Sequence, residues 1–322
     1  LRMGPTSSWI HIGIIILYFL GFFLIVNFNV LKYRKYLLFL LLLCLNILIW
    51  KSGVDNHSSR VQWIQFDVGQ GDAALLITPR RKTVLIDGGL KSSFFDNGKQ
   101  IISVYLNKKG LKKINYVILT HPHSDHVGGL LHIIENFNID RIYYSNCPYE
   151  TAMYSSFLKA VKQRNIELYE VTSPDSLILS TCKLYFLSPS KHQKNETKKV
   201  RFNVNNQSLV TCFMYGRTKI LFMGDAEREI EQHILQRYHS LQCNVIKIGH
   251  HGSSTSSTYA FLKQVDPDLG IISVGENNRF HLPSELVLQY LELFNIDIHR
   301  TDKQGAAVLI SNGSIITKVD WK

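Results

Sequence analysis

One stretch decides the fold, Thr120-His121-Pro122-His123-Ser124-Asp125-His126, which places three imidazoles and a carboxylate within six residues. It follows an apolar run, residues 114–120, that is typical of a buried strand, and a helix is expected to begin after Asp125. Alternate residues of an extended turn point to one side, so His121 and His123 are expected together. Neutral imidazole and carboxylate are ligands that divalent metals such as zinc prefer. The stretch predicts a metal site, with Asp125 and His126 offset enough to serve a second ion.

Strands and helices alternate on either side of this motif. Upstream, residues 61–68, 74–78 and 83–87 are typical of short strands joined by turns. Downstream, residues 209–215 and 219–225 suggest a hairpin, and a helix (227–238) and two strands (244–249 and 269–274) follow. This order predicts an α/β (α+β) fold, an αββα sandwich with two sheets face to face and helices outside. Functional residues should then lie on loops along one edge of the sandwich.

The N-terminal region has a membrane composition, because its first fifty residues contain no Asp or Glu. From Trp9 to Leu31 there are roughly twenty apolar residues without a charge, the length of a transmembrane helix. A second run, Leu37 to Trp50, is shorter and spans only if flanking lysines snorkel to the interfaces. We therefore predict that residues 1–52 form a hairpin of two transmembrane helices. The alternative, a secretory signal peptide, has one short apolar core after a basic start.

The hinge Lys32-Tyr33-Arg34-Lys35 gives this hairpin an orientation. Short basic loops stay on the cytoplasmic side, so residues 60–322, the predicted hydrolase domain, should lie outside the cell membrane. The chain opens on Leu1 and a polar stretch, and we expect it to be a C-terminal fragment of a longer multi-pass membrane protein.

Charge points to an anionic partner. Removing Arg2, Lys32, Arg34 and Lys35 from the 36 Lys and Arg leaves 32 against 25 Asp and Glu, a net charge of +7. Such a balance suits DNA, anionic lipid or wall polymer, and also simply aids solubility. A basic stretch within Ser188–Asn206 is predicted to be a surface loop that either contacts substrate or is a solvated linker. The five cysteines form no C-x-x-C pair, which argues against finger-type zinc.

At this point the sequence resembles the metallo-β-lactamase superfamily, whose members follow such a motif with a bridging Asp after a strand and a late His. Gly224-Asp225 ends an apolar strand, and Lys247-Ile248-Gly249-His250-His251-Gly252-Ser253 ends the strand after the next helix. The resemblance implies a site for two divalent ions, Zn²⁺ or Mn²⁺, bridged by Asp225. The implied metal ligands are His121, His123, Asp125, His126, Asp225 and His251, with His250 and Ser253 facing substrate.

One departure from the superfamily concerns the first ion. Relatives supply it with another His from a loop before the bridging Asp, but the corresponding stretch here, Val204-Asn205-Asn206-Gln207-Ser208, contains none. An amide is a poor metal ligand, so Asn205 and Asn206 are expected to bind substrate or a metal-bound water instead. This first site should be weaker and should favour an oxygen-tolerant ion such as Mn²⁺.

The resemblance narrows to the C-terminal domain of the ComEC family of competence DNA-uptake channels. Four stretches occur in order: FDVGQGDA from Phe66, NNQS from Asn205, GHHGS from Gly249 and SVGENNRFH from Ser273. The match covers about Val61 to Ile310, although relatives commonly read His-Pro where this chain reads His281-Leu282-Pro283. It implies a nuclease outside the membrane that degrades the DNA strand that is not taken up, with the rest of a channel and other competence proteins as partners.

That implied chemistry assigns roles to further residues. Two ions about 3.5 to 4 Å apart lower the pKa of a shared water and bind phosphate oxygens. His250 or His281 is expected to bind phosphate or protonate the leaving oxygen. Lys247 is a second candidate for the phosphate charge, and Asp125 completes the predicted catalytic set. Asp67, Asp72 and Asp87 are expected to orient ligand imidazoles or to close tight turns, and a purely structural role fits them equally.

Two other classes of function stay open on the sequence. The same site would suit another phosphoester, such as phosphocholine or a wall polymer, or a lactone. The missing His and the shifted His281 would also suit a catalytically weak module that only guides DNA.

Overall fold

The structure is a computed structural model that describes residues 18, 19, 33, 36, 38–46, 59–190 and 203–320. The chain divides into two compact units, Leu1–Ser58 and Ser59–Lys322. In the first unit, residues 38–46 are helical. None of the helices in the described part of the chain has the length and apolar character of a membrane span. Most of the two predicted transmembrane helices, the hinge between them and the basic loop at 191–202 lie outside the described residues.

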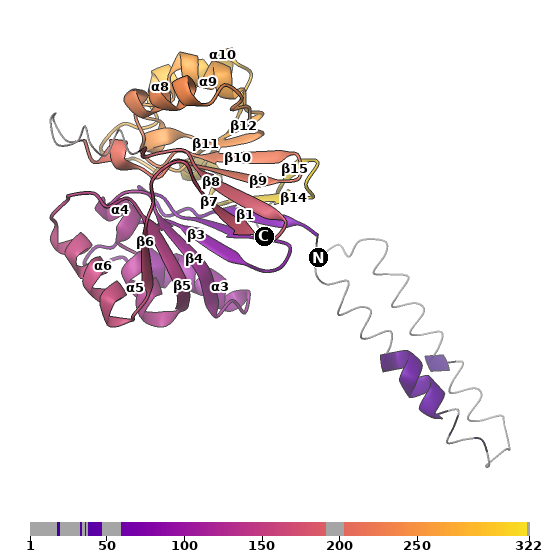
Figure 1. The fold of residues 1–322 in the computed structure, drawn as a ribbon. Helices are drawn as coiled ribbons and strands as arrows, with labels where there is room; N and C mark the ends of the chain where they lie inside the picture. The colour runs from indigo at the N-terminus through magenta and orange to yellow at the C-terminus, as the bar shows by residue number, and fades with distance from the viewer. Residues whose placement is uncertain are drawn as a thin grey trace. The chain divides into compact units, whose positions relative to one another are not determined.

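Residues 59–322 form two sheets (Figure 1). The eight-stranded sheet has the order β15-β14-β1-β2-β3-β4-β5-β6, and the seven-stranded sheet has the order β13-β12-β11-β10-β9-β8-β7. The first comprises β1 (Val61–Gln65), β2 (Ala74–Ile77), β3 (Thr83–Ile86), β4 (Lys113–Leu119), β5 (Asn138–Tyr144), β6 (Glu167–Glu170), β14 (Ala307–Ser311) and β15 (Ile316–Val319). The second comprises β7 (Asp175–Leu179), β8 (Cys182–Phe186), β9 (Thr211–Tyr215), β10 (Thr218–Phe222), β11 (Val245–Lys247), β12 (Leu269–Ile272) and β13 (Asp297–Arg300).

Helices cover the outer face of each sheet (Figure 1). With the first sheet belong η1 (Gly98–Ile102), α3 (Ser103–Lys108), α4 (Ser124–Val127), α5 (Leu130–Asn136) and α6 (Ala152–Gln163). With the second belong η2 (Asn205–Gln207), α8 (Arg228–Arg237), η3 (Gly249–Gly252), α9 (Tyr259–Val265), α10 (Glu285–Leu293) and α11 (Thr301–Gln304). The αββα sandwich predicted from the sequence is confirmed.

Three apolar cores hold the layers together. One strand contributes to two of these cores, because its successive side chains point to opposite faces of the sheet. In β2, Leu76 packs between the two sheets, whereas Leu75 packs under the helices. The ring of Trp63 meets that of Phe222 across the inter-sheet core at 4.9 Å in an edge contact. Both faces of these strands are therefore buried, which explains their near-continuous apolar sequences.

The strand directions bring the loops of the predicted site to one edge. The pairs β3–β4, β10–β11 and β11–β12 are parallel, so their carboxyl ends lie together within each sheet. Asp87 follows β3, the His-rich motif follows β4, Asp225 follows β10 and His250 follows β11. Residues separated by more than a hundred positions in the sequence thus reach the same edge of the sandwich.

Candidate metal centre

The His-rich motif forms a sharp turn between β4 and α4. His123 is extended (φ −64°, ψ 150°) and precedes the first residue of α4. The N–H of Thr120 donates to Asp87 Oδ1 at 2.8 Å, which fixes the start of the turn against the end of β3. His121 and His126 are completely buried, and their ring centroids lie 4.1 Å apart. His121 and His126 therefore point into the interior, whereas His123 is half-buried.

Asp225 is the centre of the cluster. Its N–H donates to Ser208 Oγ at 3.0 Å, and the preceding Gly224 takes a left-handed conformation (φ +54°). Its Oδ2 lies 3.7 Å from the Nε2 of His121, 3.4 Å from that of His126 and 3.5 Å from that of His251. A single carboxylate oxygen thus faces three imidazoles from two different sheets.

Two sets of donors share this carboxylate. Within each set the ligand atoms lie within 4.8 Å of one another, the first set being Asp72, His126, Asp225 and His251 and the second being His121, His123 and Asp225. No hydrogen-bond partner among the described residues reaches these buried atoms of the cluster: Nε2 of His126, Nε2 of His251 and Oδ1 of Asp225. Leaving such groups unpaired in the interior is costly. Nitrogen and oxygen donors of this kind fit two adjacent divalent cations, which would satisfy them.

Hydrogen bonds at Nδ1 fix which ring nitrogen faces the centre. His126 Nδ1–H donates to Asp87 Oδ2 at 2.8 Å, and His251 Nδ1–H donates to the carbonyl of Ser273 at 2.8 Å. Thr120 Oγ1 donates to Asp87 Oδ2 at 2.7 Å, so it accepts from His121 Nδ1, 3.1 Å away. The Nε2 atoms of His126 and His251 therefore face the centre, whereas His121 Nε2 accepts from His123 Nδ1 at 3.0 Å, a contact that a metal ion would replace.

Burial and neighbouring charges divide the imidazoles of the centre into two groups. Burial lowers the pKa of His121 well below its usual value and also lowers that of His123, so both rings are neutral. Burial alone would raise the pKa of Asp225, but the neighbouring imidazoles, His251 first, hold it well below its ordinary value. Burial alone would lower the pKa of His126 and His251 as well, but the surrounding carboxylates, Asp225 first, raise both above the ordinary value. A metal ion at these two rings would therefore displace a proton from each.

Asp72 and Lys247 form a buried ion pair beside this carboxylate. Lys247 Nζ contacts Asp72 Oδ2, donates to the carbonyl of Gly224 at 3.1 Å and lies 4.0 Å from Asp225 Oδ1. The Lys247 side chain is only 3% exposed. This arrangement corrects the expectation that Lys247 meets the substrate phosphate, because its ammonium is enclosed and already neutralised. Asp72, expected near the metals, lies in the first donor set itself.

His250 stands on the open side of the cluster. Its side chain is 26% exposed, and its Nε2 lies 4.0 Å from Asp225 Oδ2. Its Nδ1 lies 3.4 Å from Glu227 Oε1 and 3.2 Å from Thr255 Oγ1. His250 and His251 both adopt left-handed conformations (φ 46° and 54°), which carry strain outside glycine. This strained turn sends His251 inward and His250 toward solvent, and their roles as metal ligand and substrate-facing residue stay predictions.

The predicted asparagines lie around a glutamate that the sequence analysis missed. Asn205 Nδ2 donates to Glu227 Oε1 at 2.9 Å and lies 3.4 Å from His250 Nε2. Asn206 Nδ2 donates to Glu229 Oε2 at 2.6 Å, and its Oδ1 accepts the N–H of Glu227 at 3.1 Å. Hydrogen bonds from His250 and Asn205 hold the pKa of Glu227 below its usual value although burial opposes them. Asn206 is thus engaged by protein groups rather than turned toward a substrate.

The remaining predicted residues lie at different depths. Asp125 Oδ2 is 3.5 Å from His251 Nε2, and its side chain is 27% exposed. The Oγ of half-buried Ser253 lies 3.1 Å from Thr255 Oγ1 at the rim. Asp67 is exposed and closes a tight turn by accepting the N–H of Gly69. His281 is exposed, and in the described part of the chain no hydrogen bond or ion pair links its side chain to the cluster. Its loop borders the turn that carries His250 and His251, because the N–H of Ser284 donates to the carbonyl of Gly252 at 2.9 Å, and the role of His281 stays a prediction.

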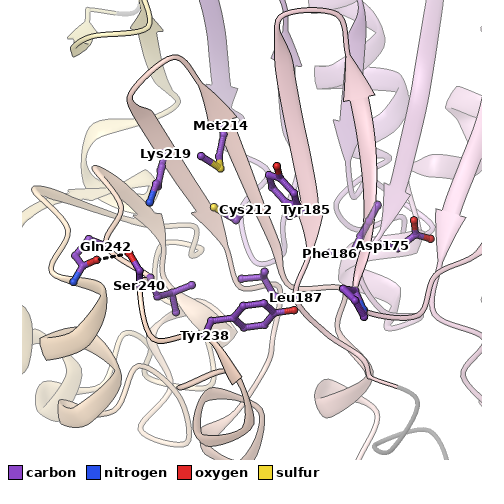
Figure 2. Close-up of a pocket in the computed structure, with 12 residues that line it drawn as sticks. Asp175, Tyr185, Phe186, Leu187, Cys212, Met214, Lys219, Tyr238, Ser240 and Gln242 are labelled. Atoms are coloured by element: carbon purple, nitrogen blue, oxygen red, sulfur yellow. Dashed lines mark hydrogen bonds between the residues drawn. The ribbon is translucent and has the colours of Figure 1, made fainter. Parts of the chain in front are cut away.

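Two cavities have different relations to this centre. A cavity of ≈ 10 Å³, about the size of one water, lies behind the ligands and is lined in part by Gln65, Asp72, Asp87, Thr120 and Lys247. A larger one of ≈ 270 Å³ is framed mainly by apolar side chains of β8 and β9, such as Tyr185 and Met214, together with Tyr238 (Figure 2). None of the predicted site residues lines the larger cavity.

Comparisons with known proteins agree with this architecture. Residues 67–177 match the metallo-beta-lactamase superfamily. The chain is 30% identical to ComE operon protein 3 of Bacillus subtilis, over 77% of this chain and 33% of that protein. It is 28% identical to competence protein ComA of Neisseria gonorrhoeae, over 78% and 32% respectively. The chain thus spans about a third of the length of these relatives.

A solved structure shows the same fold. The metal-dependent hydrolase Tm1679 of the β-lactamase superfamily superposes with a TM-score of 0.51 at 13% identity, covering 81% of this chain and 100% of that one.

Proposed function

This chain belongs to the metallo-β-lactamase superfamily and carries the domain type of the ComEC-like competence proteins, and on that premise we propose that it hydrolyses phosphodiester bonds of DNA. The observation that carries the proposal is the position of Asp225, whose Oδ2 lies within 3.4–3.7 Å of three imidazoles and is shared by both donor sets. A shared carboxylate is how proteins hold two ions close enough to clamp one phosphodiester.

The bound ions would lower the pKa of a water molecule and neutralise the charge that develops on the phosphate. The ion with the fuller donor set would be held by His126, Asp225 and His251 with Asp125 or Asp72, and the other by His121, His123 and Asp225. Asp87 and the carbonyl of Ser273 keep the Nε2 lone pairs of His126 and His251 aimed at the centre. The protein therefore orients these two ligands before an ion binds.

Departure of the alcohol oxygen requires a proton, and His250 is placed to deliver it. It is the imidazole beside Asp225 that reaches solvent on the open side, and Glu227 holds its Nδ1 at 3.4 Å. In this role Nδ1–H donates to Glu227, and Nε2 exchanges its proton with the substrate. Asn205 keeps Glu227 in place through a 2.9 Å hydrogen bond.

A nucleic acid is the favoured substrate among phosphoesters. The net charge of +7 over residues 60–322, from 31 Lys and Arg against 24 Asp and Glu, would draw a polyanion to the domain. The ComA relative is named as a competence protein. We further propose that the domain acts outside the cell membrane on the strand that is not transported, beside the rest of a DNA-uptake channel and other competence proteins.

The test uses the full chain in mild detergent with Mn²⁺ or Zn²⁺ and end-labelled DNA. We expect cleavage by the wild type, loss of cleavage in Asp225→Asn, and unchanged cleavage in the control Asp297→Asn, whose side chain is exposed on β13. Hydrolysis of p-nitrophenyl phosphate or a lactone without DNA cleavage would show that the site acts on another substrate. Tight DNA binding without any bound metal would indicate a guiding module and refute the enzymatic role.

A further inference from the structure

A short hairpin between β3 and η1 carries two adjacent aromatic side chains at its tip. Phe94 is 95% exposed and Phe95 is 45% exposed. Large apolar side chains are normally buried, because removing their surface from water stabilises the folded state. Neighbouring apolar groups left in water at one point are a mark of an interaction site.

Hydrogen bonds hold this tip in one conformation. Lys91 and Asp96 form an isolated antiparallel β-bridge, and their side chains pair at 3.2 Å. Ser92 Oγ accepts the N–H groups of Phe94 and Phe95 at 3.3 and 3.1 Å, and Ser92 N–H donates to the carbonyl of Phe95 at 2.7 Å. A turn fixed in this way loses little conformational entropy when its side chains bind.

The base of the hairpin rests on the residues that directly follow the metal ligands. A Cβ on Gly128 would lie 2.4 Å from the backbone nitrogen of Lys91, and one on Gly98 would lie 1.9 Å from the carbonyl oxygen of Gly129. Just before the hairpin, Gly88 N–H donates to the carbonyl of His126 at 2.7 Å. These contacts tie the base of the hairpin to the turn that presents His126.

We propose that the Phe94–Phe95 tip is a stacking platform for unpaired bases of a nucleic acid strand that approaches the metal centre. Aromatic side chains accept any base, because every base has a π-face. The exposed Lys99, three residues past the hairpin, adds positive charge for the backbone of the strand. A duplex already buries the faces of its bases, so the platform favours single-stranded over double-stranded DNA. The inference rests on the proposed function for its substrate, but it concerns binding and does not require cleavage.

The first experiment measures fluorescence anisotropy of labelled oligo(dT) and of a matched duplex with the full chain in EDTA. We expect Phe94→Ala/Phe95→Ala to bind oligo(dT) about tenfold more weakly. Its salt dependence should be unchanged, because the phosphate contacts remain. The affinity of this double variant for the duplex should not change. The control Ile178→Ala, which removes a 68% exposed side chain from β7, should bind both DNAs as the wild type does. Equal oligo(dT) affinities, or equal losses on both DNAs, would overturn the proposal.

A second experiment places a reporter at the tip. In Phe94→Trp, we expect oligo(dT) to quench the added tryptophan emission relative to wild type. A blue shift with phosphatidylglycerol vesicles and no response to oligo(dT) would instead assign the tip to the membrane and overturn the proposal. Both binding experiments are done without metal, so they test the Phe94–Phe95 tip independently of cleavage. A chain that binds DNA through the tip but never cleaves it would contradict only the proposed nuclease function.

Discussion

Asp87→Asn tests whether the hydrogen bonds around the ligands select the metal-binding tautomer. Asp87 has a left-handed backbone (φ 58°), which asparagine tolerates, and its Oδ1 bond to the N–H of Thr120 can be kept by the amide oxygen. The other carboxylate oxygen, however, accepts both Thr120 Oγ1–H and His126 Nδ1–H. An amide nitrogen there faces two donors, so the His126 proton must move to Nε2, and the ring turns a proton toward the metal.

The expected loss is specific to one ion. Removing an interaction that orients a metal ligand lowers metal affinity by about 10- to 100-fold, or about 1.4–2.7 kcal/mol. Titration of the metal-free chain with Zn²⁺ against a competing chelator should show one of two sites weakened by this amount, with the site of His121 and His123 much less affected. The matched control Asp140→Asn changes a surface carboxylate 2.8 Å from Lys113, and both affinities should stay at the wild-type value. Unaltered binding of both ions by Asp87→Asn would refute the tautomer argument.

Three further predictions concern stability and reactivity. Lys247→Met leaves the Asp72 carboxylate buried and unpaired, so the free energy of unfolding, measured with denaturant in EDTA, should fall by about 3–5 kcal/mol. Adding Asp72→Leu to this variant should recover much of the lost stability. Additive losses from the two substitutions would contradict the pairing. Gly71→Ala places a Cβ 2.4 Å from the carbonyl oxygen of Asp125 at a backbone φ of +133°, so the free energy of unfolding should fall by about 1–3 kcal/mol. The control Gly110→Ala has a φ of +66° but no atom of the described residues within 4 Å of the new Cβ, so its free energy of unfolding should fall less. Burial raises the pKa of Cys147 to about 12 and that of Cys182 and Cys212 to about 11, so these thiols are protonated at about pH 8. They should react with a thiol reagent only after unfolding. Fast labelling of the native chain would contradict this prediction, because it would show that the thiols are accessible.

Much of the fold follows from local sequence patterns. Runs of apolar residues such as 114–120 and 219–223 are strands buried on both faces, and their lengths distinguish them from helices. The histidine motif is equally readable, because its ligands share one turn. The left-handed conformations of His250 and His251 explain why two consecutive histidines face different ways, but no rule of spacing predicts which one turns inward.

The missed features depend on distance in the chain. Asp72 and Lys247 meet only because β2 and β11 belong to sheets that face each other, and 175 residues separate them. Glu227 stands two residues after Asp225 and was readable as a carboxylate near the site, yet its role depends on His250 folding back against it. His281 stays a prediction, because a motif suggests a site residue and the structure leaves its side chain exposed, without a hydrogen bond to the described cluster.

The most direct test of the account is the cleavage rate of labelled DNA as the metal-free chain is titrated with Mn²⁺. Two donor sets that share Asp225 predict little activity up to one equivalent and a steep rise as the second is added. Full activity at one equivalent, or none at any ratio, would contradict a two-metal nuclease built on Asp225.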